Sequence, residues 1–237
     1  MKKYNINLTY GDKLPGRYEG GVYVSFSPRD CERLKNGPSA ENTAWLCHAE
    51  YSMGLHMMQI VRRKDRGAAG ICMLNNNRLL IDPFAQDVFK YADVYHFPVM
   101  IGIGDGEQGG FCDKPGLPLL EHCLQDYPSA MFIVCGEGFW KEINNCGNSG
   151  ISILAKLFSQ YPNLYASLQG FNPQKHGNAA AQLMNSYADR IFFAENGDEY
   201  SVEMWLDNAY AQGTISDTAY RRICIENTKN LIIDKRL

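Results

Sequence analysis

Short apolar runs recur along the chain, and stretches with helical periodicity separate them. Two of the runs, 98–103 and 131–135, are continuous rather than alternating. Continuous apolar runs are typical of parallel strands that are covered on both faces. The whole pattern predicts eight strands, at residues 4–10, 21–26, 44–51, 70–74, 98–103, 131–135, 163–168 and 190–194.

The stretches between these runs predict helices. Asp82 followed by Pro83 is a good helix start, because an acidic N-cap and a proline in the first turn both suit that position. Ser216 is a second expected N-cap. The predicted helices span residues 54–65, 82–95, 117–126, 149–161, 179–187, 201–212 and 216–230.

Regular alternation of strand and helix predicts an α/β fold with a parallel sheet. Eight units in 237 residues fit a (β/α)8 TIM-type barrel, a fold of roughly 200 to 400 residues. The first run, 4–10, should then pair with the eighth. An open doubly wound sheet usually carries a glycine-rich phosphate loop after its first strand. Residues 10–15 (YGDKLP) form no such loop, so we expect one barrel domain over residues 1–237.

Composition and charge limit the kinds of partner that such a domain could bind. The net charge is −3, and the densest basic stretch, Arg62 to Lys64 with Arg66, is too short to follow a phosphate backbone. We therefore expect no nucleic-acid partner. The basic N-terminal residues precede no apolar signal segment, and no apolar run is long enough for a membrane helix. The eight cysteines include no C-x-x-C pair, so we expect reduced thiols and a cytoplasmic protein.

Five segments resemble the amidohydrolase-related family of metal-dependent hydrolases and decarboxylases, in the order of that family. FPVMIGIG at 97–104 is similar to the family's fifth-strand phrase "glPvliHtG". YPSAMFIVCGEG at 127–138 is similar to "fPdlkiilgHlG". YPNLYAS at 161–167 resembles "ypNvyvdtS", and ADRIFFAEN at 188–196 resembles "gadRilFGtD". IENTKNL at 225–231 resembles the closing phrase "i.eNArrLl". The resemblance implies an amidohydrolase-like barrel.

The residues that would bind a metal in that family are replaced here. The family's first strand reads "iDvHvHlG", and residues 4–11 (YNINLTYG) place Asn7 and Thr9 at the two histidines. Gly102 and Gly136 stand at the histidines of the fifth and sixth strands, and Asn196 stands at the aspartate of the eighth. Zinc needs imidazole, carboxylate or thiolate ligands. We therefore expect no bound metal at this position and no cofactor.

Other polar residues fall at the carboxyl ends of predicted strands, which is where barrels of this type place their sites. His48 and Glu50 share one face of the third strand by their i, i+2 spacing, and they are the weak candidates for acid–base chemistry. The candidate ligand-binding residues at this rim are Asn7, Thr9, His48, Glu50, Asp105, Glu137, Glu195 and Asn196.

These residues favour a barrel that has lost metal-dependent hydrolysis and binds a small polar molecule or a partner at its carboxyl-terminal rim. The alternative is a hydrolase or lyase that uses metal-free chemistry or rearranged ligands. Metal analysis and pocket variants separate the two. The sequence leaves a homo-oligomer open and does not identify the ligand.

Overall fold

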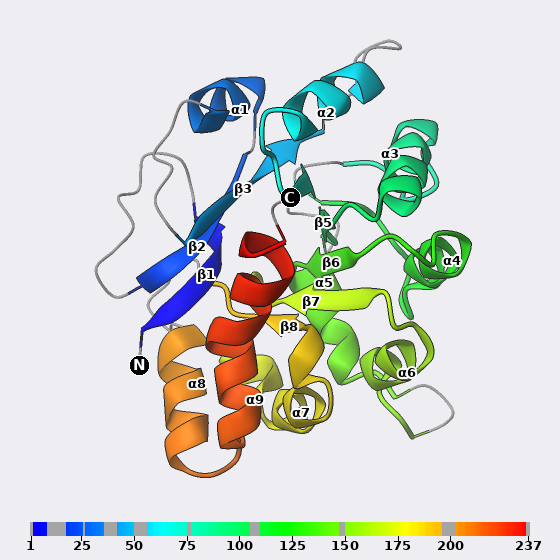
Figure 1. The fold of residues 1–237 in the computed structure, drawn as a ribbon. Helices are drawn as coiled ribbons and strands as arrows, with labels where there is room; N and C mark the ends of the chain where they lie inside the picture. The colour runs from blue at the N-terminus through cyan, green and yellow to red at the C-terminus, as the bar shows by residue number, and fades with distance from the viewer. Residues whose placement is uncertain are drawn as a thin grey trace.

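The chain forms a parallel barrel of eight strands (Figure 1). The computed structural model describes residues 2–8, 18–25, 27–35, 42–49, 56–74, 77–104, 110–146, 150–195 and 202–235. Each strand pairs in parallel with the next along the chain. The strands are β1 (Lys3–Leu8), β2 (Tyr18–Val24), β3 (Thr43–His48), β4 (Gly70–Met73), β5 (Val99–Gly102), β6 (Phe132–Cys135), β7 (Leu164–Ser167) and β8 (Ile191–Phe192).

The first strand meets the last, so the predicted barrel is confirmed. The Ile6 N–H donates to the Phe193 carbonyl at 3.0 Å, which joins β1 to the end of β8. Asn5 adds a second link, because its Oδ1 accepts the Glu195 N–H at 3.3 Å. Each of the eight predicted runs overlaps a strand of the sheet, and the differences are a few residues at the ends.

Helices cover the outside of the strands (Figure 1). Asp82 and Ser216 cap their helices as predicted, accepting the N–H groups of Phe84 and Ala219. Two helices, α1 and α5, were not expected from the sequence. The helices are α1 (Pro28–Lys35), α2 (His56–Lys64), α3 (Pro83–Tyr95), α4 (Pro118–Asp126), α5 (Glu137–Trp140), α6 (Ile153–Gln160), α7 (Pro173–Ser186), α8 (Val202–Ala211) and α9 (Asp217–Arg221).

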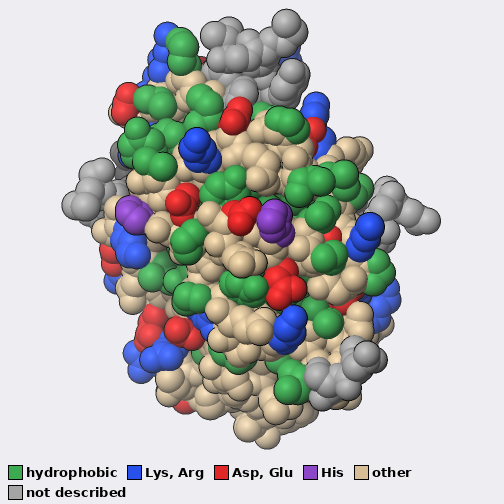
Figure 2. Space-filling model, turned by 90° about the vertical axis from the view of Figure 1, so that its right-hand side faces the viewer, with side chains coloured by type: hydrophobic (Ala, Val, Ile, Leu, Met, Phe, Trp, Pro, Cys, Tyr) green, Lys and Arg blue, Asp and Glu red, His purple; other side chains and the backbone are tan. Residues whose placement is uncertain are grey.

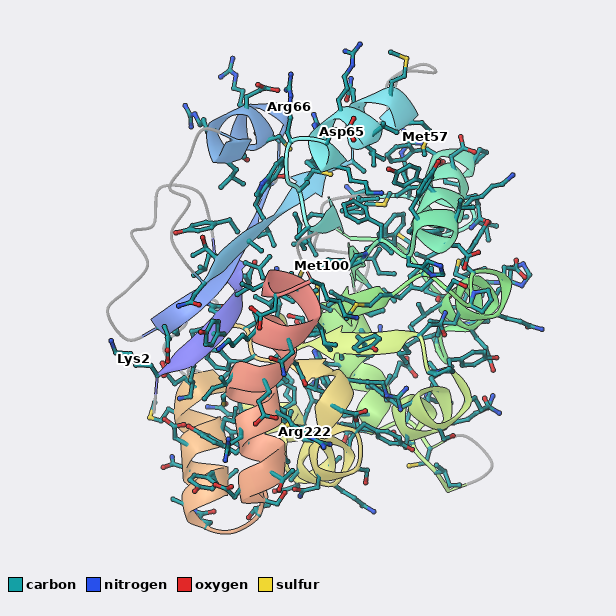
Figure 3. The ribbon with its side chains drawn as sticks, viewed as in Figure 1. Lys2, Met57, Asp65, Arg66, Met100 and Arg222 are labelled. Carbon is teal, nitrogen blue, oxygen red and sulfur yellow. The ribbon has the colours of Figure 1, made fainter. Side chains whose placement is uncertain are left out.

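Strand register shows which side chains face the barrel interior. Phe132 packs against Phe89 of α3 with ring centroids 5.1 Å apart, so Phe132 and its partners in the neighbouring strands face the helices. The adjacent row therefore faces inward, because successive strand residues alternate. Figure 3 places Met100 of that row near the middle of the ring of strands. The inward row contains His48, Cys72, Met100, Ile133 and Tyr165.

Three polar residues from the segments that resemble the family form hydrogen bonds at the connections between helices and strands. The buried amide of Asn163 donates to the carbonyls of Leu124 and Tyr127 at the end of α4. The Arg190 guanidinium donates to Phe158 and Tyr161 at the end of α6, and the Asn227 amide donates to Ala188 and Ile191 beside β8. Each satisfies carbonyls that a helix end or strand start leaves open.

The C-terminal segment continues α9 through two π-helical turns, η4 (Arg222–Glu226) and η5 (Lys229–Ile233). η5 packs against β2 and β3. All eight cysteines lie within the described residues, and no disulfide joins any two of them. Within the described ranges, no helix is long and apolar enough to cross a membrane.

Candidate functional site

The carboxyl-terminal rim of the barrel carries four of the predicted site residues within the described part of the chain. These are Asn7, His48, Glu137 and Glu195. Thr9, Glu50, Asp105 and Asn196 lie outside the described residues, so the predicted pairing of His48 with Glu50 stays a prediction.

The backbone of His48 is held by side chains from three other segments. His48 ends β3 in the inward row, and its side chain is half-buried. The His48 N–H lies 2.6 Å from Ser25 Oγ and 3.2 Å from Cys31 Sγ, and the Arg63 guanidinium donates to the His48 carbonyl. These contacts fix the main chain at His48, so the position from which its side chain leaves the strand is well defined.

Asn5 was missed by the sequence analysis, although it ties together the ends of β1 and β8. Its Oδ1 accepts the N–H of Asn7 at 2.9 Å as well as that of Glu195. Asn5 is 3% exposed, so both bonds are shielded from water. This carboxamide therefore sets the position of Asn7 at the rim.

Glu137 and Glu195 both have partners within the protein. Glu195 is buried, and its Oε2 accepts the N–H of Glu203 at 2.9 Å in the first turn of α8. A carboxylate in that position stabilises the start of a helix. Glu137, the first residue of α5, forms an ion pair with Lys175 at 2.7 Å. Neither contact was foreseen, because each depends on where a later helix docks.

Glycines bring backbone segments very close together at the ends of β5, β6 and β7. Gly136 has φ 100° and ψ 158°, a conformation that is essentially restricted to glycine. A Cβ on Gly136 would overlap the carbonyl oxygen of Ile103, and one on Gly138 would overlap that of Gly104. A Cβ on Gly102 would lie 2.9 Å from the Leu74 oxygen, and one on Gly170 would lie 2.7 Å from the Gly136 Cα.

The residues present do not fit the metal site that the family resemblance implies. Two of its ligand positions, Gly102 and Gly136, have no side chain, and neighbouring backbone fills the space where a Cβ would stand. Across the described ranges, no group of three or more His, Cys, Asp or Glu side chains could hold a metal ion. Three protein ligands are the usual minimum for catalytic zinc.

A buried histidine lies beside the rim, in the first turn of α7. His176 is 5% exposed, and its Nδ1 lies 3.0 Å from Asn144 Nδ2. Its buried Nε2 has no hydrogen-bond partner among the described residues. Burial lowers the pKa of His176 from its ordinary 6.5, and the charge of Lys175 lowers it further, while Glu137 opposes the change. The neutral imidazole is therefore the form that the fold favours.

The stability of the protein should accordingly fall in acid, with His176 as one cause. The unfolded chain binds the proton more readily, so the contribution of His176 is present above pH 6.5 and is lost as the pH falls. We expect the drop in Tm between about pH 7.5 and about pH 5 to be smaller in His176→Gln than in the wild type. His122→Gln, on exposed α4, is the control. Equal drops in wild type and His176→Gln would contradict the assignment.

A cavity of about 760 Å³ lies at the opposite, amino-terminal end of the barrel. We name it the basal cavity. Its lining includes the segments that lead into β4, β5 and β6, at 67–69, 95–98 and 129–131, together with η5. The ligand site predicted from the sequence lies at the other rim, and no sequence signal indicated this cavity. Because half of the predicted rim residues lie outside the described ranges, the rim stays a prediction.

Solved structures with a similar fold are known, although sequence comparisons find no relative. No family model and no curated protein matches the sequence. A TIM-barrel protein from Bordetella bronchiseptica, called uncharacterized, has a TM-score of 0.65 and 19% identity, over 91% of this chain and 78% of that one. 2,6-Dihydroxybenzoate decarboxylase, with its substrate bound, has a TM-score of 0.62 and 11% identity, over 97% and 98%.

A third structure, named as a "probable" 2-pyrone-4,6-dicarboxylic acid hydrolase from Acinetobacter baumannii with bound citric acid, has a TM-score of 0.60. Its identity is 13%, over 98% of this chain and 99% of that one. At such identities the likeness concerns the fold and leaves the chemistry open. The chain therefore has a TIM-barrel fold similar to that of these proteins, as the sequence segments predicted.

Proposed function

We propose that this barrel binds a small polar ligand at its carboxyl-terminal rim and does not catalyse metal-dependent hydrolysis. One observation carries the proposal: close-packed backbone at Gly102 and Gly136 occupies the space where two metal ligands would have to stand. A change of side chain alone could not restore those ligands, because the neighbouring carbonyl oxygens block a Cβ.

The described rim side chains support binding better than metal-free catalysis. Glu137 and Glu195, the described carboxylates among the predicted site residues, are held by Lys175 and by the start of α8. His48 is held by its backbone and is half-exposed. Gln169 lies near Cys135, whose Sγ donates to Gln169 Oε1 at 3.7 Å. An imidazole and a carboxamide suit hydrogen bonds to a polar molecule.

We further propose that the protein acts in the cytoplasm. Six of the eight cysteines are buried, and burial raises the pKa of Cys135 to about 12. Such thiols are unreactive, because the thiolate is the reactive form. They behave as small apolar residues of the core, which agrees with a compartment where thiols stay reduced.

Metal content tests the proposal directly. We expect protein purified without chelators or nickel resin to contain far less than one equivalent of zinc, iron or manganese per chain. Titration with Zn²⁺ or Mn²⁺ in a calorimeter should show no tight site that Asn7→Ala or Asn196→Ala removes. About one equivalent of transition metal, lost in either variant, would restore the hydrolase interpretation.

Ligand binding is tested separately by thermal shift against a panel of small polar molecules. A ligand of the rim should raise the Tm of the wild type and of Lys64→Met, whose lysine lies at the other end of the barrel. His48→Gln should lose most of that shift. A shift that survives in His48→Gln and disappears in Lys64→Met would belong to the other end of the barrel. If no shift in the panel is lost in His48→Gln, the site at the rim would be contradicted.

A further inference from the structure

The basal cavity has an apolar floor made by the amino-terminal mouth of the barrel. Met131 directly precedes β6, Tyr165 lies in β7, and Phe97 lies two residues before β5. Leu231 of η5 adds an apolar side chain from the C-terminal segment. The volume of about 760 Å³ is in the range of sites that enclose small organic molecules.

Hydrogen bonds fix the walls of this cavity. Asp93 Oδ1 accepts the N–H groups of Ser129 and Ala130 at 2.7 and 3.2 Å, which ties the loop before β6 to the end of α3. The Ala69 N–H donates to the Trp45 carbonyl at 2.8 Å, which fixes the segment before β4. A cavity with fixed walls loses little conformational entropy when a ligand enters.

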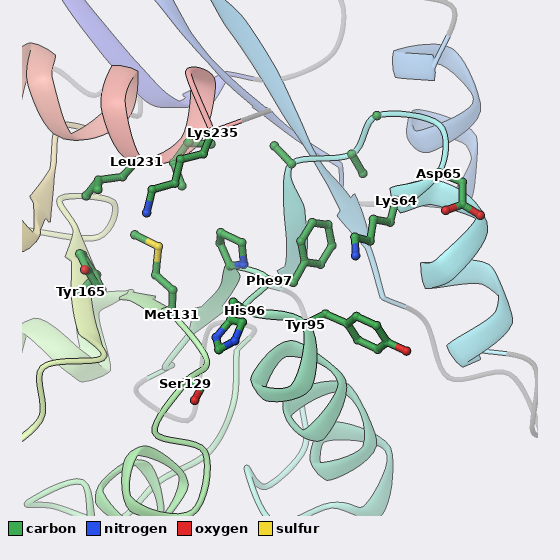
Figure 4. Close-up of a pocket in the computed structure, with 15 residues that line it drawn as sticks. Lys64, Asp65, Tyr95, His96, Phe97, Ser129, Met131, Tyr165, Leu231 and Lys235 are labelled. Atoms are coloured by element: carbon green, nitrogen blue, oxygen red, sulfur yellow. The ribbon is translucent and has the colours of Figure 1, made fainter. Parts of the chain in front are cut away.

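Two lysines give the cavity a positive charge. Lys64, the last residue of α2, holds its ammonium 4.7 Å from the Tyr95 ring centroid and 5.7 Å from that of Phe97. Figure 4 shows Lys64 on the side of these rings and Lys235 on the side of Leu231 and Met131. Asp65 also lines the cavity, and it lies beyond Lys64 on the side away from Lys235. Within the described residues, neither lysine has a carboxylate partner.

We propose that the basal cavity is a binding site for an organic carboxylate with an apolar body. The apolar floor would hold the body, and the carboxylate would bind the ammonium group of Lys64 or that of Lys235, which line opposite sides of the cavity (Figure 4). A phosphate suits the described lining less well, because that part of the lining contains no arginine and none of the described α-helices begins there. This site lies at the end of the barrel opposite the proposed rim site and does not depend on it.

Octanoate is the probe, and octanamide is its neutral counterpart of nearly equal size. Protein labelled with ¹³C at the methionine methyl groups is titrated with each compound at millimolar concentration. Octanoate should shift the Met131 methyl signal and leave that of Met204, exposed on α8, unchanged. We expect octanoate to bind about threefold more tightly than octanamide, because its carboxylate gains one partly exposed ion pair with a lysine.

The double variant Lys64→Met with Lys235→Met should bind octanoate no better than octanamide. Arg62→Met is the matched control, because Arg62 lies in the same last turn of α2 but does not line the cavity. It removes the same favourable interaction with the helix dipole, and it should leave octanoate binding unchanged. Absence of a Met131 shift, equal affinity for the two probes, or an equal loss in Arg62→Met would each overturn the proposal.

Discussion

Gly136→Ala should destabilise the protein by about 3 to 5 kcal/mol, although it adds a single methyl group. Two effects combine at this residue. The backbone at φ 100° and ψ 158° is strained for any residue with a Cβ, and the added methyl overlaps the Ile103 carbonyl oxygen. Relief requires β5 and β6 to separate at their carboxyl ends. Equilibrium unfolding in urea gives the change in the free energy of unfolding.

Gly116→Ala separates the two effects. Gly116 has φ +87°, close to that of Gly136, but nothing lies within 4 Å of its would-be Cβ. The control should therefore cost only about 1 to 2 kcal/mol, the penalty for a positive φ. If Gly136→Ala lowers the free energy of unfolding no more than Gly116→Ala does, the backbone at the rim can move to make room for a side chain. The argument against a metal ligand at this position would then fail.

The scaffold was predictable because its signals are local. Apolar runs identified every strand, and Asp82 and Ser216 identified two helix starts from their own side chains. The start of α7 was placed at 179, whereas the helix begins at Pro173. Its signal was present, since Asn172 followed by Pro173 is a good cap. The charged stretch of α1 lacks a long apolar periodicity, and α1 was missed for that reason.

The site was less predictable because it depends on contacts between distant segments. The partner of Glu195 belongs to α8, and the partner of Glu137 belongs to α7. The basal cavity joins residues from α2, α3, β7 and η5, and no short motif connects them. The segments that resemble the amidohydrolase-related family contain residues with a structural role. Asn163, Arg190 and Asn227 hold backbone joints, which the fold needs whatever chemistry occupies the rim.

A buried ion network fastens β1 to the C-terminal helices. The Lys3 side chain is 2% exposed, and its ammonium lies 2.9 Å from Glu203 Oε1 and 2.7 Å from Asp207 Oδ1. The Tyr220 hydroxyl donates to Asp207 Oδ1 at 2.5 Å, and the ammonium lies 5.8 Å from the Tyr220 ring centroid. Burial alone would lower the pKa of Lys3, but the hydrogen bonds to Asp207 and Glu203 outweigh it and raise the pKa.

The cost of breaking this network should depend on which partner is removed. Replacing both carboxylates, in Glu203→Gln with Asp207→Asn, leaves a buried ammonium without a counter-charge, and we expect a loss of about 3 to 5 kcal/mol. Lys3→Met should cost only about 1 to 2 kcal/mol, because methionine fills the same space and the carboxylates, 21% and 48% exposed, can reach water.

Urea unfolding at neutral pH measures both losses, and alkaline unfolding checks the sign of the pKa change. Because the folded pKa of Lys3 lies above 10.5, its contribution is complete below that pH and is lost as the pH rises through the folded value. The Lys3→Met variant should lack this component. A larger loss in Lys3→Met than in the double carboxylate variant would show that water reaches the ammonium, and β1 would then depend on Lys3 through packing rather than charge.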